Sequence, residues 1–97
     1  MKRIPKKIQL LNHKITVKVI PKSRWPECDA DAVGVWDNER NEIRILRQPR
    51  TQLHHTFWHE VAHAILDMMG ETKISRDERF VDAIGGLLAQ TMDSAEF

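Results

Sequence analysis

The sequence contains few or none of several residue types, and each scarcity limits what this protein can be. Its only cysteine is Cys28, so the 97 residues form no internal disulfide and suit a reducing compartment. Tyrosine is absent. No apolar run approaches the ~20 residues of a membrane span, and no uninterrupted apolar segment follows the basic residues after Met1, so no signal peptide is expected. These absences predict a cytoplasmic protein.

The length and composition predict one small domain. A chain of 97 residues is long enough for a single hydrophobic core. Hydrophobic residues make up 41% and charged residues 30%, as in ordinary globular proteins. No repeat, low-complexity segment or linker divides the sequence, so we expect one domain spanning residues 1–97.

The net charge of +1 conceals an uneven distribution of charge. Residues 1–26 contain eight lysines and arginines and no aspartate or glutamate. One interpretation is a solvated hairpin face beside an acidic body; the other is a surface that binds an acidic partner. Only Trp25 lies near these charges, so stacking on nucleic-acid bases is not indicated. Binding to a membrane is not indicated either.

Alternating apolar residues predict a small sheet of three or four strands. Residues 8–10 and 14–20 alternate with period two on either side of a short turn, which predicts a β-hairpin. Residues 33–36 and 43–46 flank a turn-forming polar segment and predict a second pair of strands. We therefore expect a mainly antiparallel sheet.

Two helices are predicted after these strands. Apolar residues recur at helical spacing over about 19 residues, with Thr51 as a candidate N-cap and Gly70 as the C-cap. A second helix is predicted over residues 76–92. It contains Gly85 and Gly86, whose expected role is close approach to the first helix. The predicted fold class is α+β, with two main helices packed on a small sheet.

The first helix contains the stretch that carries chemistry, His59-Glu60-Val61-Ala62-His63, of the form H-E-x-x-H. Residues four apart lie on one helix face, so both imidazoles can bind one metal ion. Glu60 points about 100° around the helix and can hold a metal-bound water. Zinc lowers the pKa of such a water towards about 7, and a carboxylate accepts its proton. The alternative is an ordinary amphipathic helix with two histidines.

Two histidines do not complete a zinc site, which usually has a third protein ligand and a water. Glu78 is the best-placed candidate, and Asp82, one turn later, can accept a hydrogen bond from a ligand histidine. Ser75-Arg76-Asp77-Glu78 is also a capping box, in which Glu78 would only satisfy a backbone N–H. Both readings are open, and the next candidates for the third ligand are His55, Glu71 and Asp77.

The H-E-x-x-H stretch followed by Glu78-Arg79-Phe80-Val81-Asp82 resembles the H-E-x-x-H and E-x-x-x-D motifs of gluzincins, the thermolysin-like zinc metallopeptidases. From about Val33 onward, the order of elements is similar to minimal zincin domains of phage and mobile-element proteins, including ImmA/IrrE-type peptidases. The resemblance implies that His59, His63 and Glu78 bind Zn²⁺, that Glu60 is the general base, and that Asp82 orients His59. It also implies that the strand at residues 43–46 forms the cleft edge along which an extended peptide lies.

One feature departs from the gluzincin pattern. Thermolysin-like enzymes use a Tyr or His from elsewhere to stabilise the oxyanion, and this chain has no Tyr. His54, His55 or an Arg could take that place.

The sequence therefore predicts a zinc-dependent peptidase that hydrolyses peptide bonds with a metal-activated water and Glu60 as general base. The alternative is a non-catalytic, zinc-stabilised interaction module that binds a protein or nucleic-acid partner through its basic N-terminal hairpin. A fully liganded metal with no open position would favour the module.

Overall fold

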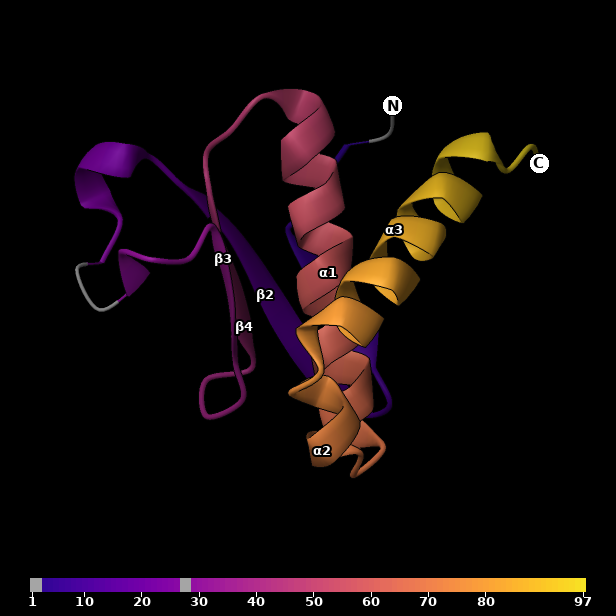
Figure 1. The fold of residues 1–97 in the computed structure, drawn as a ribbon. Coiled ribbons are helices and arrows are strands. Elements are labelled where there is room, and N and C mark those ends of the chain that lie inside the picture. Colours follow the sequence, from indigo (N-terminus) through magenta and orange to yellow (C-terminus); the bar gives the residue numbers. More distant parts are fainter. Residues whose placement is uncertain (1–2, 27–28) are drawn as a thin grey trace.

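The computed structural model describes residues 3–26 and 29–97, so Cys28 lies outside the described residues. These residues form a four-stranded mixed sheet, two main helices and one further short helix (Figure 1). The elements are β1 (Lys7–Leu10), β2 (His13–Ile20), the 3₁₀ helix η1 (Lys22–Arg24), β3 (Gly34–Asp37), β4 (Glu42–Leu46), α1 (Arg50–Met68), α2 (Thr72–Ser75) and α3 (Glu78–Ser94). The predicted α+β class is confirmed. Among the described helices, none is both long and apolar enough to cross a membrane.

The sheet has the strand order β1-β2-β4-β3, with antiparallel pairs at both ends and a parallel pair, β2 and β4, in the middle. Both predicted hairpins form. The expectation that residues 43–46 form the cleft edge is wrong, because β4 is an inner strand and β3 is the edge strand. After β2 the chain forms β3 at the edge of the sheet and then turns back as β4, which pairs with β2.

The inner face of the sheet packs against α1 and forms the hydrophobic core. Period-two alternation places Ile15, Ile43 and Ile45 on this face, and all three are fully buried. They pack against Phe57 and Val61 of α1. Burial of each such side chain contributes about 1.5–3 kcal/mol, so this contact fixes α1 on the sheet.

Ion pairs connect side chains on the outer face of the sheet. The Arg44 guanidinium lies 3.0 Å from Glu42, 3.1 Å from Asp37 and 3.3 Å from Asp29. The ammonium of Lys18 lies 2.7 Å from the Glu42 carboxylate, and this contact, with Arg44, lowers the pKa of Glu42. One lysine of the basic hairpin is therefore engaged within the protein.

Helix α1 begins two residues earlier than a cap at Thr51 would require, because Pro49 occupies the N-cap position. Its C-terminal end is the one expected. Gly70 has a φ of 78°, a left-handed conformation that glycine adopts without steric cost. The Gly70 N–H donates to Asp67 O (3.0 Å) and the Glu71 N–H to Leu66 O (2.8 Å), a Schellman motif that reverses the chain.

The second main helix differs from the prediction at its start. The short helix α2 comes first, and α3 begins at Glu78 with Asp77 as its N-cap, whose Oδ1 accepts a hydrogen bond of 3.1 Å from the Phe80 N–H. The capping-box reading of Ser75 and Glu78 is therefore wrong. Asp77 is as good a capping residue as serine, and capping by it leaves both of those side chains free to face α1.

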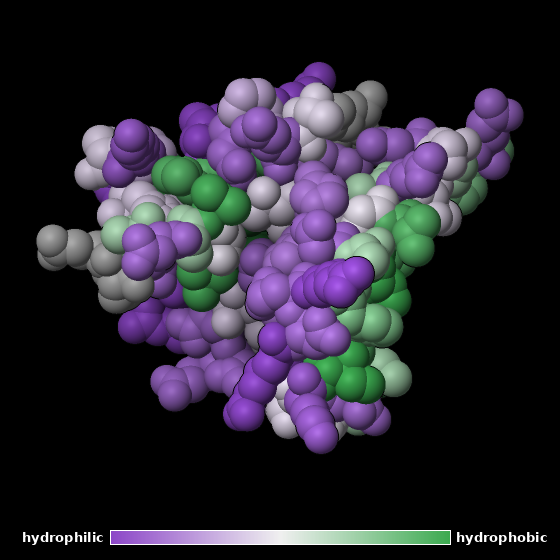
Figure 2. Space-filling model, viewed as in Figure 1, coloured by the Kyte–Doolittle hydropathy of each residue, from purple (hydrophilic) through white to green (hydrophobic). Residues whose placement is uncertain are grey.

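Helix α3 packs on α1 by one face only. Val81, Gly85 and Ala89 are buried on that face. The opposite face exposes apolar side chains, which Figure 2 shows as a hydrophobic band over α3; its exposed members are Phe80, Ile84 and Leu87.

We expect that alanine at position 85 destabilises the fold, whereas alanine at position 86 does not. A Cβ at Gly85 would lie 2.9 Å from the Cα and 3.0 Å from the N of His59, backbone atoms that move only if the helices separate. A Cβ at Gly86 would meet nothing closer than the His55 ring at 3.4 Å. We expect Gly85→Ala to lower the free energy of unfolding by about 1–3 kcal/mol, and Gly86→Ala to raise it by up to about 1 kcal/mol. Urea denaturation measures both, and equal stabilities of the two variants would contradict this close approach.

Candidate metal centre

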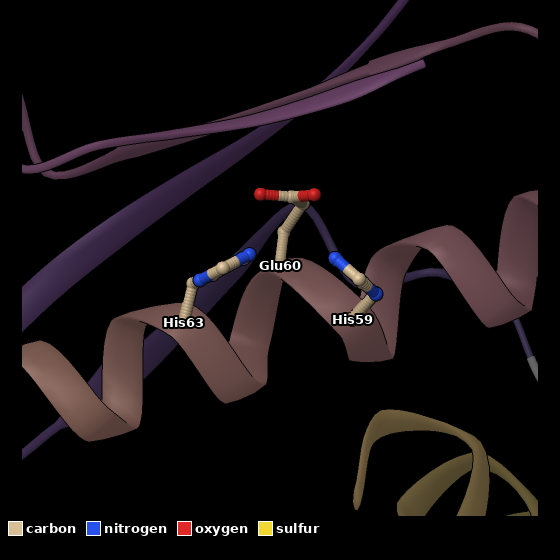
Figure 3. A group of neighbouring side chains, drawn as sticks. All are labelled: His59, Glu60 and His63. Carbon is tan, nitrogen blue, oxygen red and sulfur yellow. The ribbon is translucent and has the colours of Figure 1, made fainter. Parts of the chain in front are cut away.

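Three side chains of the H-E-x-x-H stretch converge on one side of α1. His59, Glu60 and His63 each place a potential ligand atom within 4.8 Å of the others (Figure 3). The two imidazole rings, one helical turn apart, have centroids 5.0 Å apart. Figure 3 shows the Glu60 carboxylate extending away from α1, between the two histidines. The geometry predicted from the spacing is present.

Helix α3 brings Glu78 to the same point. Its Oε2 lies 3.0 Å from Nε2 of His59, and its Oε1 lies 3.1 Å from Nε2 of His63. The turn at Gly70 and the short helix α2 return the chain antiparallel to α1, which places the start of α3 opposite the two histidines. Glu78 therefore faces both predicted metal ligands rather than a backbone N–H.

The donor set of two imidazoles and a carboxylate fits zinc. In a tetrahedral site with bonds of about 2.0–2.1 Å, neighbouring ligand atoms are separated by roughly 3.3 Å. The observed 3.0 Å and 3.1 Å between Glu78 and the two Nε2 atoms are within a few tenths of that value. The group of ligand atoms that lie within 4.8 Å of one another consists of His59, Glu60 and His63, so Glu60 is a second carboxylate near the two histidines, and Glu78 approaches each histidine through a different oxygen.

Carboxylates lie against both ring nitrogens of His59, an arrangement that a second proton or a metal ion would satisfy. Its Nδ1 lies 3.3 Å from Oδ1 of Asp82, and since a carboxylate only accepts, this nitrogen carries the proton. In a neutral imidazole, Nε2 then presents a lone pair to the Glu78 carboxylate. Two acceptors at 3.0 Å repel unless a proton or a metal ion lies between them.

The side chains that hold the histidines in place come from α2 and α3. Asp82 of α3 contacts His59 and, through the same Oδ1, the Nε2 of His55 at 3.1 Å. Ser75 of α2 places its Oγ 3.0 Å from Nδ1 of His63. Burial lowers the pKa of His63, which favours the neutral form that binds metals. Asp82 thus lies where the sequence predicted it, and Ser75 is a contact that the sequence did not reveal.

Glu60 is a buried carboxyl group with a raised pKa. It is only 6% exposed, and burial raises the pKa of its carboxyl to about 7, with the negative charge of Glu78 acting in the same direction. The positive charge of His59 and a hydrogen bond from the backbone N–H of Trp36 oppose the rise. A pKa near the working pH is the value that proton transfer requires.

The pKa of Glu60 predicts how pH affects the stability of the metal-free protein. Its pKa of about 7 in the folded state exceeds the unfolded value of about 4.5. Proton binding by Glu60 therefore stabilises the fold fully below pH ~4.5, and this contribution is lost as the pH rises through about 7. Its size is on the order of 3 kcal/mol.

Glutamine at position 60 has no charge at any pH, so this variant isolates the contribution of Glu60 titration to the free energy of unfolding. The difference in unfolding free energy between Glu60→Gln and the parent should rise by on the order of 3 kcal/mol between pH 5 and 8. Urea denaturation in the presence of a chelator measures the difference, in which the titrating groups that do not interact with Glu60 cancel. A difference that does not change with pH would show that Glu60 titrates normally.

The centre opens into a cleft of about 660 Å³ between β3 and α1. Gly34 is required for this arrangement, since a Cβ there would lie 2.7 Å from Thr56 and 3.0 Å from Glu60. The Trp36 indole forms part of the cleft wall and donates a 2.8 Å hydrogen bond to Asp67. The cleft thus runs along the edge strand and past the metal centre.

His54 and His55, the two histidine candidates for stabilising the oxyanion, lie in different parts of the structure. His55 lines the cleft, whereas His54 is buried elsewhere, with its Nδ1 3.4 Å from Asp93. His54 is therefore excluded as the oxyanion donor, and no Arg is among the described residues that line the cleft. Asp77 caps α3, so it is not the third ligand.

Sequence reasoning missed Gly34, Trp36, Asp67 and Ser75 as parts of the site. A glycine inside a strand pattern is the one signal that was available, because it often marks close approach of another chain segment. The other three act through contacts that the sequence does not encode locally.

Comparison with known proteins finds no match: no family model, no curated protein and no solved structure is significantly similar to this chain.

Proposed function

We propose that this protein is a zinc-dependent peptidase of the gluzincin type, in which His59, His63 and Glu78 bind the ion and Glu60 is the general base. One observation carries the proposal. The Glu78 carboxylate lies against Nε2 of both histidines, while Glu60, with a pKa of about 7, lies beside them. The resemblance of the two motifs to gluzincins supports the same assignment.

When bound, zinc would supply a Lewis acid that makes a water more acidic and polarises a substrate carbonyl. The residues of this chain do the rest. Glu60 accepts a proton from the attacking water and donates it to the leaving amine. Asp82 contacts Nδ1 of His59 and Ser75 contacts Nδ1 of His63, and these contacts hold the two imidazoles in orientation.

The cleft supports an extended peptide as the substrate. Strand β3 has a free edge, and its residues Gly34, Val35 and Trp36 line the cleft beside the metal centre. Backbone N–H and C=O groups of an edge strand pair readily with an added strand. His55, which lines the cleft and is half exposed, is the candidate for stabilising the oxyanion.

The cleft also favours a peptidase over the interaction module. A structural zinc site is closed by four protein ligands. Here the centre adjoins a cavity of about 660 Å³, which gives a substrate access. The basic hairpin as a partner surface remains a separate prediction.

The decisive experiment combines metal analysis with cleavage. The purified protein should contain one zinc per chain, and His59→Ala should contain none. A peptide library, read by mass spectrometry, should show new cleavage products with the parent and none with His59→Ala or after chelation. Equal zinc contents in both proteins would refute the metal site, and stoichiometric zinc without any cleavage would favour the module.

A further inference from the structure

A single helix does not cover this sheet. Four strands at about 4.8 Å spacing are wider than one helix of about 10 Å diameter, and α1 packs mainly on β3 and β4. Helix α3 packs on α1, not on the sheet. A cavity of about 380 Å³ therefore remains between β1 and α1. Its apolar wall consists of Ile8, Leu10, Phe57, Trp58, Val61, Ile65 and Met92.

One end of this cavity is cationic. A second cavity, of about 270 Å³, shares Arg3 and His54 with it and is also lined by Arg47 and Arg50. Neither cavity has an aspartate or glutamate among its described lining residues. No ion pair joins the three arginines, which are all exposed, to another described residue, whereas Asp93 contacts His54. The apolar pocket thus adjoins a second cavity whose rim carries three arginines.

The N-terminus of α1 adds to the preference for an anion. Its first turn has no side-chain hydrogen bond at the N-cap and no acidic residue, so its N–H groups and dipole present positive potential beside Arg50. The Trp58 ring lines the apolar cavity, so its indole signal can report an occupant.

We propose that this pocket binds a small amphipathic carboxylate, with an aliphatic chain against Phe57, Val61 and Ile65 and a carboxylate at Arg3, Arg47 and Arg50. A volume of 380 Å³ lies within the range of about 300–1,000 Å³ typical of small-molecule sites, and the wall is apolar with few polar groups, as in such sites. The pocket lies on a different face of α1 from the metal centre. Its occupancy is independent of the peptidase proposal.

Decanoate, kept below its micelle-forming concentration, is the probe. The three tryptophan indole N–H signals in a ¹H–¹⁵N NMR spectrum report binding. Trp58 should shift saturably, while Trp25 and Trp36, which already donate to Asp29 and Asp67, should not and serve as internal controls. Trp58→Phe removes the signal and so assigns it.

Matched ligands and variants distinguish the contribution of the carboxylate charge from that of the aliphatic tail. Decanol should bind at least tenfold more weakly than decanoate, and decyltrimethylammonium and acetate should not bind detectably. Arg47→Gln and Arg50→Gln should each weaken decanoate binding about threefold to tenfold. Lys14→Gln, which removes one charge from the exposed hairpin, should leave the affinity within twofold.

Three results would overturn the proposal. The first is the absence of a saturable shift of Trp58 with the folded parent protein. The second is equal binding of decanol and decanoate, or equal loss in Lys14→Gln and Arg50→Gln, because the arginine rim would then have no role. The third is sedimentation with vesicles of phosphatidylglycerol without decanoate binding, which would assign this surface to a membrane.

Discussion

Replacing Glu60 with glutamine is expected to reduce peptide hydrolysis by about 10²–10⁴-fold while leaving one zinc per chain. Glutamine keeps the size of the side chain and accepts the Trp36 hydrogen bond, but it takes up no proton. The measurement is the rate of cleavage of a peptide found in the library experiment, together with elemental analysis of the same samples.

The matched control for this change is Glu39→Gln. Glu39 lies in the exposed β3–β4 turn, outside the cleft, so its replacement should leave the rate within twofold. Undiminished hydrolysis by Glu60→Gln would mean that another group accepts the proton. A loss of zinc in Glu60→Gln would instead assign that carboxylate as a metal ligand.

Replacing Glu78 with glutamine is expected to release zinc readily to a mild chelator. The change removes the negative charge that lies against both Nε2 atoms, and a dication at two neutral imidazoles then loses much of its binding energy. Zinc affinity, measured by competition with a chromogenic chelator, should fall by more than 100-fold. Helix α3 should remain formed, since its N-cap is Asp77.

Three other variants calibrate this result. Asp82→Asn and Ser75→Ala should reduce affinity by about 10–100-fold, because they orient the histidines without binding the ion. Glu71→Gln removes an exposed carboxylate between α1 and α2 and should have no effect. If Glu78→Gln binds zinc like the parent and Glu60→Gln does not, Glu60 is the third ligand, a role that the 4.8 Å cluster also permits.

The local parts of this structure were determined by the sequence itself. Period-two alternation predicted the two hairpins, and helical spacing predicted α1 and its end at Gly70, because each pattern depends on residues a few positions apart. The placement of His59 and His63 on one helix face also depends only on local spacing. Any helix holds residues i and i+4 one turn apart, so this half of the metal centre needs no tertiary contact to form.

The tertiary structure decided everything that depends on distant segments. The stretch from Ser75 to Glu78 satisfies the rules for a capping box and for a metal ligand equally well, and only the packing of α3 on α1 through Gly85 turns Glu78 towards the histidines. Likewise, nothing local to β3 and β4 determines which of them pairs with β2 and which becomes the edge of the cleft. Burial of Glu60 under β3, which raises its pKa to about 7, follows from that pairing and from the absence of a side chain at Gly34. Local spacing thus fixes which side chains share a helix face, whereas the surroundings that set their chemistry come from segments that meet only when the chain folds.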